Sequence, residues 1–167
     1  EAQLRRSYQG AVSRAQGAQF EKSIAGACDL YREKGMADIE KTPEPMRPIK
    51  SLGEGRFVAI FEKQAQPDYK GTLAGGQAVV FEAKSTATDR ITQDRVTEDQ
   101  AERLTRCAEL GGLAFVLCQF ASGKVYKLPW GVWQRMQERF GVKYITEDSA
   151  APYRCRLTVQ GEPLFLE

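Results

Sequence analysis

The stretch that decides the fold is Gln77-Ala78-Val79-Val80-Phe81-Glu82-Ala83-Lys84, which follows a Gly75-Gly76 pair. Its β-branched and aromatic residues predict a strand, and the two glycines predict a tight reversal before it. Alternation along a strand puts Ala78, Val80, Glu82 and Lys84 on one face. Two charged side chains therefore lie inside an otherwise apolar strand, where unpaired charge is costly.

A second acidic residue, Asp68, lies upstream in Asp68-Tyr69-Lys70-Gly71, which we interpret as a strand end and turn. A hairpin pairing of the two segments would bring Asp68 beside Glu82. Two carboxylates so close are costly unless a cation neutralises them. Oxygen ligands favour a hard ion, so we expect Mg²⁺ or Mn²⁺. Lys84 could orient an attacking water or offset charge on a phosphorane-like transition state, which suggests metal-assisted phosphodiester hydrolysis.

The residues alone leave another interpretation open. In this alternative, Glu82 and Lys84 form a salt bridge on a solvated strand edge and carry no chemistry. The composition narrows the choice, because the chain of 167 residues contains no histidine. Histidine-dependent triads and His-ligated zinc sites are thereby excluded, and carboxylates, lysine, tyrosine, hydroxyls and thiols remain.

Charge, length and cysteine usage bound the class of protein. A net charge of +2 argues against a purely electrostatic nucleic-acid binder but permits a local basic groove. The length fits one soluble domain, and no apolar run is long enough for a membrane span. Cys28, Cys107 and Cys118 stand among apolar residues, so we interpret them as buried free thiols, which suits a reducing cytoplasm.

The flanking segments predict a mixed α/β layer fold in which helices flank a central sheet. Residues 1–13 are polar and expected to fray, and a helical period runs from about Ser13 to Gly35. A capping box of Thr97 and Gln100 predicts the start of a second helix. The other expected elements are strands at 36–41, 113–120 and 124–128, a mobile loop at 85–96, a helix at 130–140, and possible short strands at 143–145 and 156–159.

The segment 42–61 combines three prolines, a Gly-Glu-Gly turn and the strand-like 56–61. Such a pattern excludes helix and central strand for its first part. It predicts either a hairpin-like arm that leaves the core or an ordinary long surface loop.

Several separated motifs occur in an order that matches a known family. They are 17–21 (GAQFE), 39–45 (IEKTPEP), 63–71 (KQAQPDYKG), 81–86 (FEAKST), 99–102 (DQAE), 112–117 (GLAFVL) and 125–126 (VY). Together they resemble the RecU family, Holliday junction resolvases of the PD-(D/E)xK nuclease superfamily. The resemblance covers roughly residues 14–140.

The resemblance implies a restriction-endonuclease-like fold and one nuclease domain over 1–167, with 43–61 as a projecting stalk that enters an open four-way junction. It implies that Asp68 and Glu82 are metal ligands and that Lys84 is the catalytic lysine. Glu21 would lie near the metal or its waters, and Gln100 would support the metal site or a phosphate. The implied activity is that of a Mg²⁺- (or Mn²⁺-) dependent endonuclease that resolves Holliday junctions in DNA recombination and repair, as a cytoplasmic homodimer.

DNA contacts are expected from basic residues on the stalk, the sheet, the loop and the second helix. The candidates are Lys50, Arg56, Lys70, Arg90, Arg95 and Arg103. For the arginines, a solvated charged face is the competing interpretation. Gln66 and Pro67 depart from the family pattern, which often has threonine there, and the stalk is only modestly basic.

Other function classes remain open from the sequence. They are another PD-(D/E)xK nuclease in repair or restriction, a non-catalytic DNA-binding module, and an interaction protein whose carboxylates only pair with basic side chains. We expect branched DNA as the partner, without membrane association or a small-molecule cofactor.

Overall fold

A five-stranded sheet forms the centre of the molecule in this computed structural model, which describes residues 2–62 and 66–167. Its strands, in spatial order, are β1 (Ala37–Lys41), β4 (Tyr69–Leu73), β5 (Ala78–Ser85), β7 (Leu113–Gln119) and β8 (Val125–Pro129). The central pair, β5 and β7, is parallel, and the other neighbours are antiparallel. The sheet is therefore mixed, as predicted.

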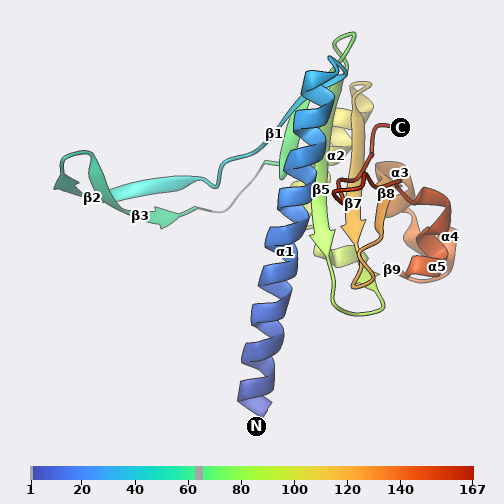
Figure 1. Cartoon of the computed structure of the whole chain (residues 1–167), viewed down its shortest axis with the longest axis horizontal. Coiled ribbons are helices and arrows are strands. Elements are labelled where there is room, and N and C mark those ends of the chain that lie inside the picture. Colours follow the sequence, from blue (N-terminus) through green and yellow to red (C-terminus); the bar gives the residue numbers. More distant parts are fainter. Residues whose placement is uncertain (1, 63–65) are drawn as a thin grey trace.

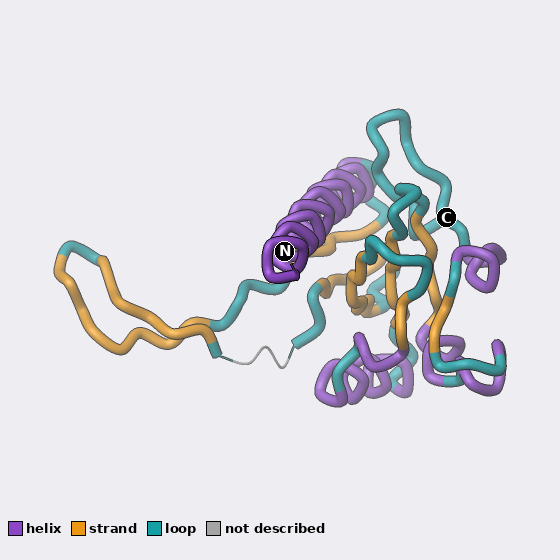
Figure 2. Tube along the Cα trace, turned by 90° about the horizontal axis from the view of Figure 1, so that it is seen from below, coloured by secondary structure: helices purple, strands orange, loops and turns teal. Residues whose placement is uncertain are grey.

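Helices cover both faces of this sheet (Figures 1 and 2). On one face, α1 (Ala2–Glu33) packs Phe20 and Ile24 against a core that includes Phe81. On the other face, α2 (Glu98–Glu109) and α3 (Trp130–Gln134) form a second core around Val116. The predicted α/β class with flanking helices is confirmed, and β5 presents Glu82 and Lys84 to the side on which α2 lies.

The first helix begins earlier than predicted. It already runs at Ala2, so the expectation of an unstructured polar segment up to residue 13 is wrong; residue 1 lies outside the described residues. Residues 2–13 contain no proline and are rich in alanine, glutamine and arginine, which favour helix without any apolar period. The N-terminal half extends beyond the sheet (Figure 1), which is why it shows no core-facing stripe.

The segment after β1 forms a two-stranded hairpin, which we call the arm (residues 43–61). Its strands, β2 (Met46–Gly53) and β3 (Arg56–Phe61), pair antiparallel and extend away from the sheet (Figures 1 and 2). At the tip, Glu54 has φ 51° between two glycines of positive φ, which accounts for the Gly-Glu-Gly sequence. Every residue of both strands is exposed.

Several local predictions were wrong for identifiable reasons. Gly71 lies within β4 rather than in a turn. The strand requires glycine at this position because a Cβ would stand 2.1 Å from the Asp38 carbonyl oxygen. The helix expected at 130–140 is interrupted at Arg135 and continues as α4 (Met136–Phe140). Residues 156–159 form no strand and contribute only an isolated bridge between Leu157 and Pro163.

Smaller elements complete the second layer. The polar loop contains β6 (Ile91–Thr92) and a 3₁₀ turn (Gln93–Arg95), and β6 pairs with β9 (Tyr144–Ile145), which confirms a short strand at 143–145. α5 (Glu147–Ala150) and a 3₁₀ turn (Ala151–Tyr153) follow. Along the described chain, none of the helices has the length and apolarity that crossing a bilayer requires.

The four cysteines are free thiols. Cys28, Cys118 and Cys155 are buried, and burial raises the pKa of Cys28 to about 12. Cys107 is only partly buried, so the expectation that it is a core thiol was wrong. It lies on α2 beside Gly112 and is not among the residues that form the second core.

Candidate active site

Two acidic side chains face each other across neighbouring strands. β4 and β5 pair with Tyr69 opposite Phe81, so Asp68, directly before β4, stands opposite Glu82. The Asp68 backbone N–H donates to Glu82 Oε1 at 3.2 Å, and the Ala83 N–H donates to Asp68 Oδ2 at 3.1 Å. The structure thus brings together the acid pair, Asp68 and Glu82, that the sequence predicted.

Burial makes this pair electrostatically costly. The Glu82 side chain is 0% exposed. Removal from water is the main cause that raises the pKa of Glu82 to about 8, and the hydrogen bond and charge of the Asp68 carboxyl act in the same direction, against an opposing effect of Lys84. A site that holds two opposed carboxyl groups in this way favours a cation between them.

Gln100 fixes the orientation of Glu82. The Thr97 side chain accepts from the Gln100 N–H, and the Thr97 N–H donates to Gln100 Oε1 at 3.0 Å, so the predicted capping box is confirmed. A backbone N–H only donates, so the amide oxygen must face Thr97. The amide nitrogen is thereby directed to Glu82, and Gln100 Nε2 donates to Glu82 Oε2 at 2.8 Å.

Lys84 completes a compact polar cluster. Its Nζ lies 3.5 Å from Glu82 Oε2 and 3.4 Å from Gln100 Oε1. Only 13% of the Lys84 side chain is exposed. The Glu82–Lys84 salt bridge of the alternative interpretation is present, but the solvated strand edge is wrong, because the ion pair is buried. An ammonium group held beside a carboxyl pair in this environment is typical of a functional site.

The acid pair fits a hard divalent cation. Both side chains supply carboxylate oxygens, which are the ligands that Mg²⁺ and Mn²⁺ prefer. Within 2–62 and 66–167, no group of three or more acidic, histidine or cysteine side chains could hold a metal. Mg²⁺ commonly binds through one or two carboxylates and keeps several waters, so a pair is sufficient.

Glu21 lines a pocket together with Lys41 and Tyr69, the residue that follows Asp68. It extends from α1, and its carboxylate lies 2.6 Å from Lys41 Nζ, with both side chains half exposed. Its observed contact is thus with Lys41 rather than with Asp68 or Glu82.

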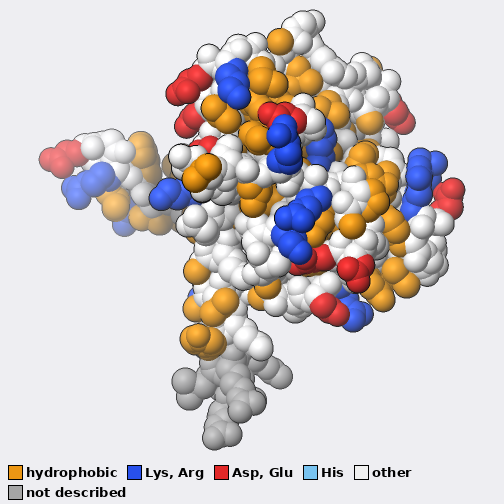
Figure 3. Space-filling model, turned by 45° about the vertical axis from the view of Figure 1, so that its right-hand side comes forward, with side chains coloured by type: hydrophobic (Ala, Val, Ile, Leu, Met, Phe, Trp, Pro, Cys, Tyr) orange, Lys and Arg blue, Asp and Glu red, His pale blue; other side chains and the backbone are white. Residues whose placement is uncertain are grey.

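The predicted DNA-contacting residues are dispersed. Lys50 and Arg56 lie on the arm, Lys70 donates to Gln66, Arg90 pairs with Asp89, and Arg95 donates to the Ser85 carbonyl. Figure 3 shows basic and acidic side chains mixed on the face in view rather than one continuous basic patch. The structure does not bring these six residues together, and their contacts with DNA stay a prediction.

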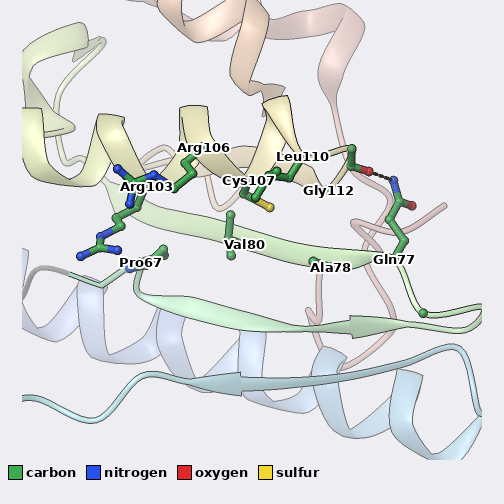
Figure 4. Close-up of a pocket in the computed structure, with 11 residues that line it drawn as sticks. Pro67, Gln77, Ala78, Val80, Arg103, Arg106, Cys107, Leu110 and Gly112 are labelled. Carbon is green, nitrogen blue, oxygen red and sulfur yellow. Dashed lines mark hydrogen bonds between the residues drawn. The ribbon is translucent and has the colours of Figure 1, made fainter.

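A groove of about 500 Å³ lies between β5 and α2 (Figure 4). Pro67 lines one end and Gln77 the other, with Arg103 reaching toward Pro67. Arg106 and Cys107 also line it and were not among the predicted site residues. Helical spacing would have found them, because Cys107 lies seven residues after Gln100 and Arg106 lies three residues after the predicted Arg103.

Comparison with known proteins identifies the family. The family model RecU, "Recombination protein U", matches residues 15–165. A "Holliday junction resolvase RecU" of Staphylococcus saprophyticus is 28% identical over 149 residues, covering 83% of this chain and 71% of the relative. One of the same name from Streptococcus gordonii is 32% identical over 120 residues, which cover 68% and 60%. The chain thus spans 60% to 71% of the length of these two relatives.

A solved structure of Archaeoglobus fulgidus Hjc, a Holliday junction resolvase, is more distantly similar. Its TM-score is 0.44 at 19% identity, covering 81% of this chain and 92% of that chain. The family model, in contrast, matches nearly the whole sequence and includes every residue of the polar cluster. The chain therefore belongs to the RecU family of recombination proteins.

Proposed function

We propose that this protein is a divalent-metal-dependent endonuclease that resolves four-way DNA junctions. The observation that carries the proposal is the acid pair, which is opposed across β4 and β5. Lys84 and Gln100 both donate hydrogen bonds to the Glu82 carboxyl group. Membership of a family whose curated relatives are named Holliday junction resolvases supports the choice of substrate.

Asp68 and Glu82 would hold Mg²⁺ or Mn²⁺. A cation bound there supplies Lewis-acid polarisation of the scissile phosphate and lowers the pKa of a water molecule. Gln100 keeps the Glu82 carboxylate oriented, and the Asp68 and Ala83 backbone N–H groups hold the pair in place. The residues are thus fixed before substrate arrives, which is the condition for strong electrostatic catalysis.

Lys84 would act on the phosphate itself. An ammonium group carries three donors, and two of them point to Glu82 and Gln100. The remaining donor can reach a phosphate oxygen or the attacking water, and so stabilise the negative charge that grows during in-line attack. Its burial strengthens this interaction relative to an exposed lysine.

The arm would provide junction selectivity. It leaves the sheet just after β1, where the Thr42 N–H donates to the Asp68 carbonyl. We propose that the chain forms one nuclease domain with residues 43–61 as a stalk that enters the open centre of the junction, aided by Lys50 and Arg56. Resolution needs two symmetric cuts, whereas one chain has one acid pair, so two copies would act as a homodimer.

The test compares labelled four-way junction, linear duplex and single strand, each with Mg²⁺ and with EDTA. Asp68→Asn and Glu82→Gln should abolish cutting yet still bind junction. Glu40→Gln is the matched control, because Glu40 is an exposed acidic residue of the sheet. Equal cutting of all substrates would favour another nuclease of the superfamily, and junction binding without cutting by the unaltered protein would favour a binding module. Unchanged cutting by either site variant would refute the site.

A further inference from the structure

A row of three side chains crosses the sheet on the face that carries α2. In the β1–β4 pair, Lys41 stands opposite Tyr69, and the Thr42 N–H donates to the Asp68 carbonyl at 2.8 Å. The ladder thus continues one residue past β1, which places Thr42 opposite Asp68. Since opposed residues of antiparallel strands share a face at Cβ separations of about 4.5–5.5 Å, Thr42, Asp68 and Glu82 form one continuous row.

Thr42 is unusual for a residue at a sheet edge. It is 5% exposed, whereas Asp38 and Glu40, on the same face of β1, are exposed. Among the described residues its Oγ1 has no hydrogen-bond partner. A buried hydroxyl without a partner is unfavourable, since it has lost its hydrogen bonds to water. The hydroxyl therefore needs a partner that residues 2–62 and 66–167 do not supply.

We infer that the Thr42 hydroxyl is the third protein oxygen of the cation site, in contact with the ion held by Asp68 and Glu82 or with one of its waters. This inference rests on the proposed function. The acid pair fills only part of the octahedral shell of Mg²⁺ or Mn²⁺, and a hydroxyl oxygen is a suitable hard donor for one of the remaining positions. The row brings such an oxygen next to Asp68 from the side opposite Glu82.

Tyr69 offers a matched comparison. Its hydroxyl is also buried and has no hydrogen-bond partner within the part of the chain that the structure describes, and Tyr69 adjoins Asp68 in the chain. However, the Tyr69 side chain points to the other face, where its ring stacks on Phe81 with centroids 4.7 Å apart. Tyr69→Phe therefore removes a buried, unpartnered hydroxyl beside Asp68 without changing the proposed cation site.

The experiment titrates the full chain with Mn²⁺ in the absence of DNA and measures free Mn²⁺ by electron paramagnetic resonance. Thr42→Val should weaken binding about tenfold, the size of effect expected for a group that supports a metal ion. Thr42→Ser should bind within about twofold of the unaltered protein, because it keeps the hydroxyl. Tyr69→Phe should bind as the unaltered protein does.

Thermal unfolding provides a second measurement. In EDTA, Thr42→Val should unfold at the same temperature as the unaltered protein or higher, because it removes an unsatisfied polar group. With Mn²⁺ added, the rise in unfolding temperature should be smaller for Thr42→Val than for Thr42→Ser. If Thr42→Val does not fold, Thr42→Ala replaces it with the same expected loss of Mn²⁺ affinity.

Asp68→Asn separates this inference from the proposed function. If Asp68→Asn binds Mn²⁺ as tightly as the unaltered protein, the proposed cation site itself is wrong. If Asp68→Asn loses binding while Thr42→Val and Thr42→Ala keep it, only the role of Thr42 is overturned.

Discussion

The polar cluster around Glu82 and the arm are opposite kinds of structure within one chain. Glu82 is fully buried and contacts Asp68, Lys84 and Gln100, which come from three separate segments. The arm is exposed along its whole length and is held mainly by its own two strands. The geometry of the polar cluster is thus determined by the core, whereas the arm lies outside the core.

This difference indicates how the two parts would work. A buried cluster with fixed partners needs no rearrangement to meet a phosphate, which is the condition for catalysis by preorganised charge. An isolated two-stranded hairpin is at best marginally stable in water. Exposed apolar side chains on the arm, such as Phe57 and Phe61, also suggest a surface that is completed by a partner.

The largest expected effect on the cleavage rate comes from substitution of Lys84 in the polar cluster. Lys84→Ala should lower the rate of junction cleavage about 100- to 1000-fold, because it removes the ammonium group from the reacting phosphate. Junction binding should change only a few-fold. Lys124→Ala, which removes a lysine paired with Glu147, is the control and should leave the rate unchanged. A Lys84→Ala rate near that of Lys124→Ala would contradict the assigned role.

Shortening the arm should alter selectivity rather than chemistry. Met46 pairs with Phe61, so replacing residues 47–60 by Asn-Gly gives a two-residue hairpin at that point. Preference for junction over linear duplex, measured by competition binding, should fall at least about tenfold, equivalent to 1.4 kcal/mol. The unfolding temperature should stay unchanged, since the arm adds nothing to either core. Retained preference would show that junction recognition resides elsewhere.

Substitution of Gln100 tests how strongly α2 supports the orientation of Glu82. Gln100→Ala should reduce the cleavage rate about tenfold, because Glu82 loses the amide that orients it. Thr97→Ala also breaks the capping box, at a cost of about 1 kcal/mol in stability, but keeps the amide. Its cleavage rate should fall less than that of Gln100→Ala. Equal losses for the two variants would indicate that Gln100 acts only through the helix end.

The smallest effect is expected from charge on the arm. Replacing Lys50 and Arg56 by alanine should weaken junction binding a few-fold. The slope of the logarithm of the binding constant against the logarithm of the salt concentration should fall in magnitude by about 0.9 for each phosphate that is no longer neutralised. Arg56 also contacts Glu54, at 3.4 Å, so its contribution should be the weaker of the two. Binding measured between low and moderate salt checks this, and an unchanged slope would exclude an interaction of these residues with phosphates.

Much of the site could be predicted because its information is local. Strand alternation placed Glu82 and Lys84 on one face, and the Gly75-Gly76 reversal predicted the hairpin that opposes Asp68 to Glu82. The capping box at Thr97 gave the start of α2. Its consequence, the locking of the Gln100 amide toward Glu82, depends on how α2 packs on β5 and so required the structure.

The remaining features depend on long-range packing. Gly71 looked like a turn residue, but its role is to let β4 approach the Asp38 carbonyl. Glu21 pairs with Lys41 because α1 packs on β1, and no local sequence pattern predicts that packing. Phe165 lies in the first core and contacts the Tyr31 and Phe81 rings, although the chain around it forms no regular element.

The position of a bound ion tests most directly whether Asp68 and Glu82 together hold a divalent cation. Crystals of the protein soaked in Mn²⁺ should show an anomalous scattering peak about 2.0–2.3 Å from carboxylate oxygens of both Asp68 and Glu82, with oxygen ligands completing the shell. A peak at another site, or none at this pair while Mn²⁺ supports cleavage in solution, would contradict the account.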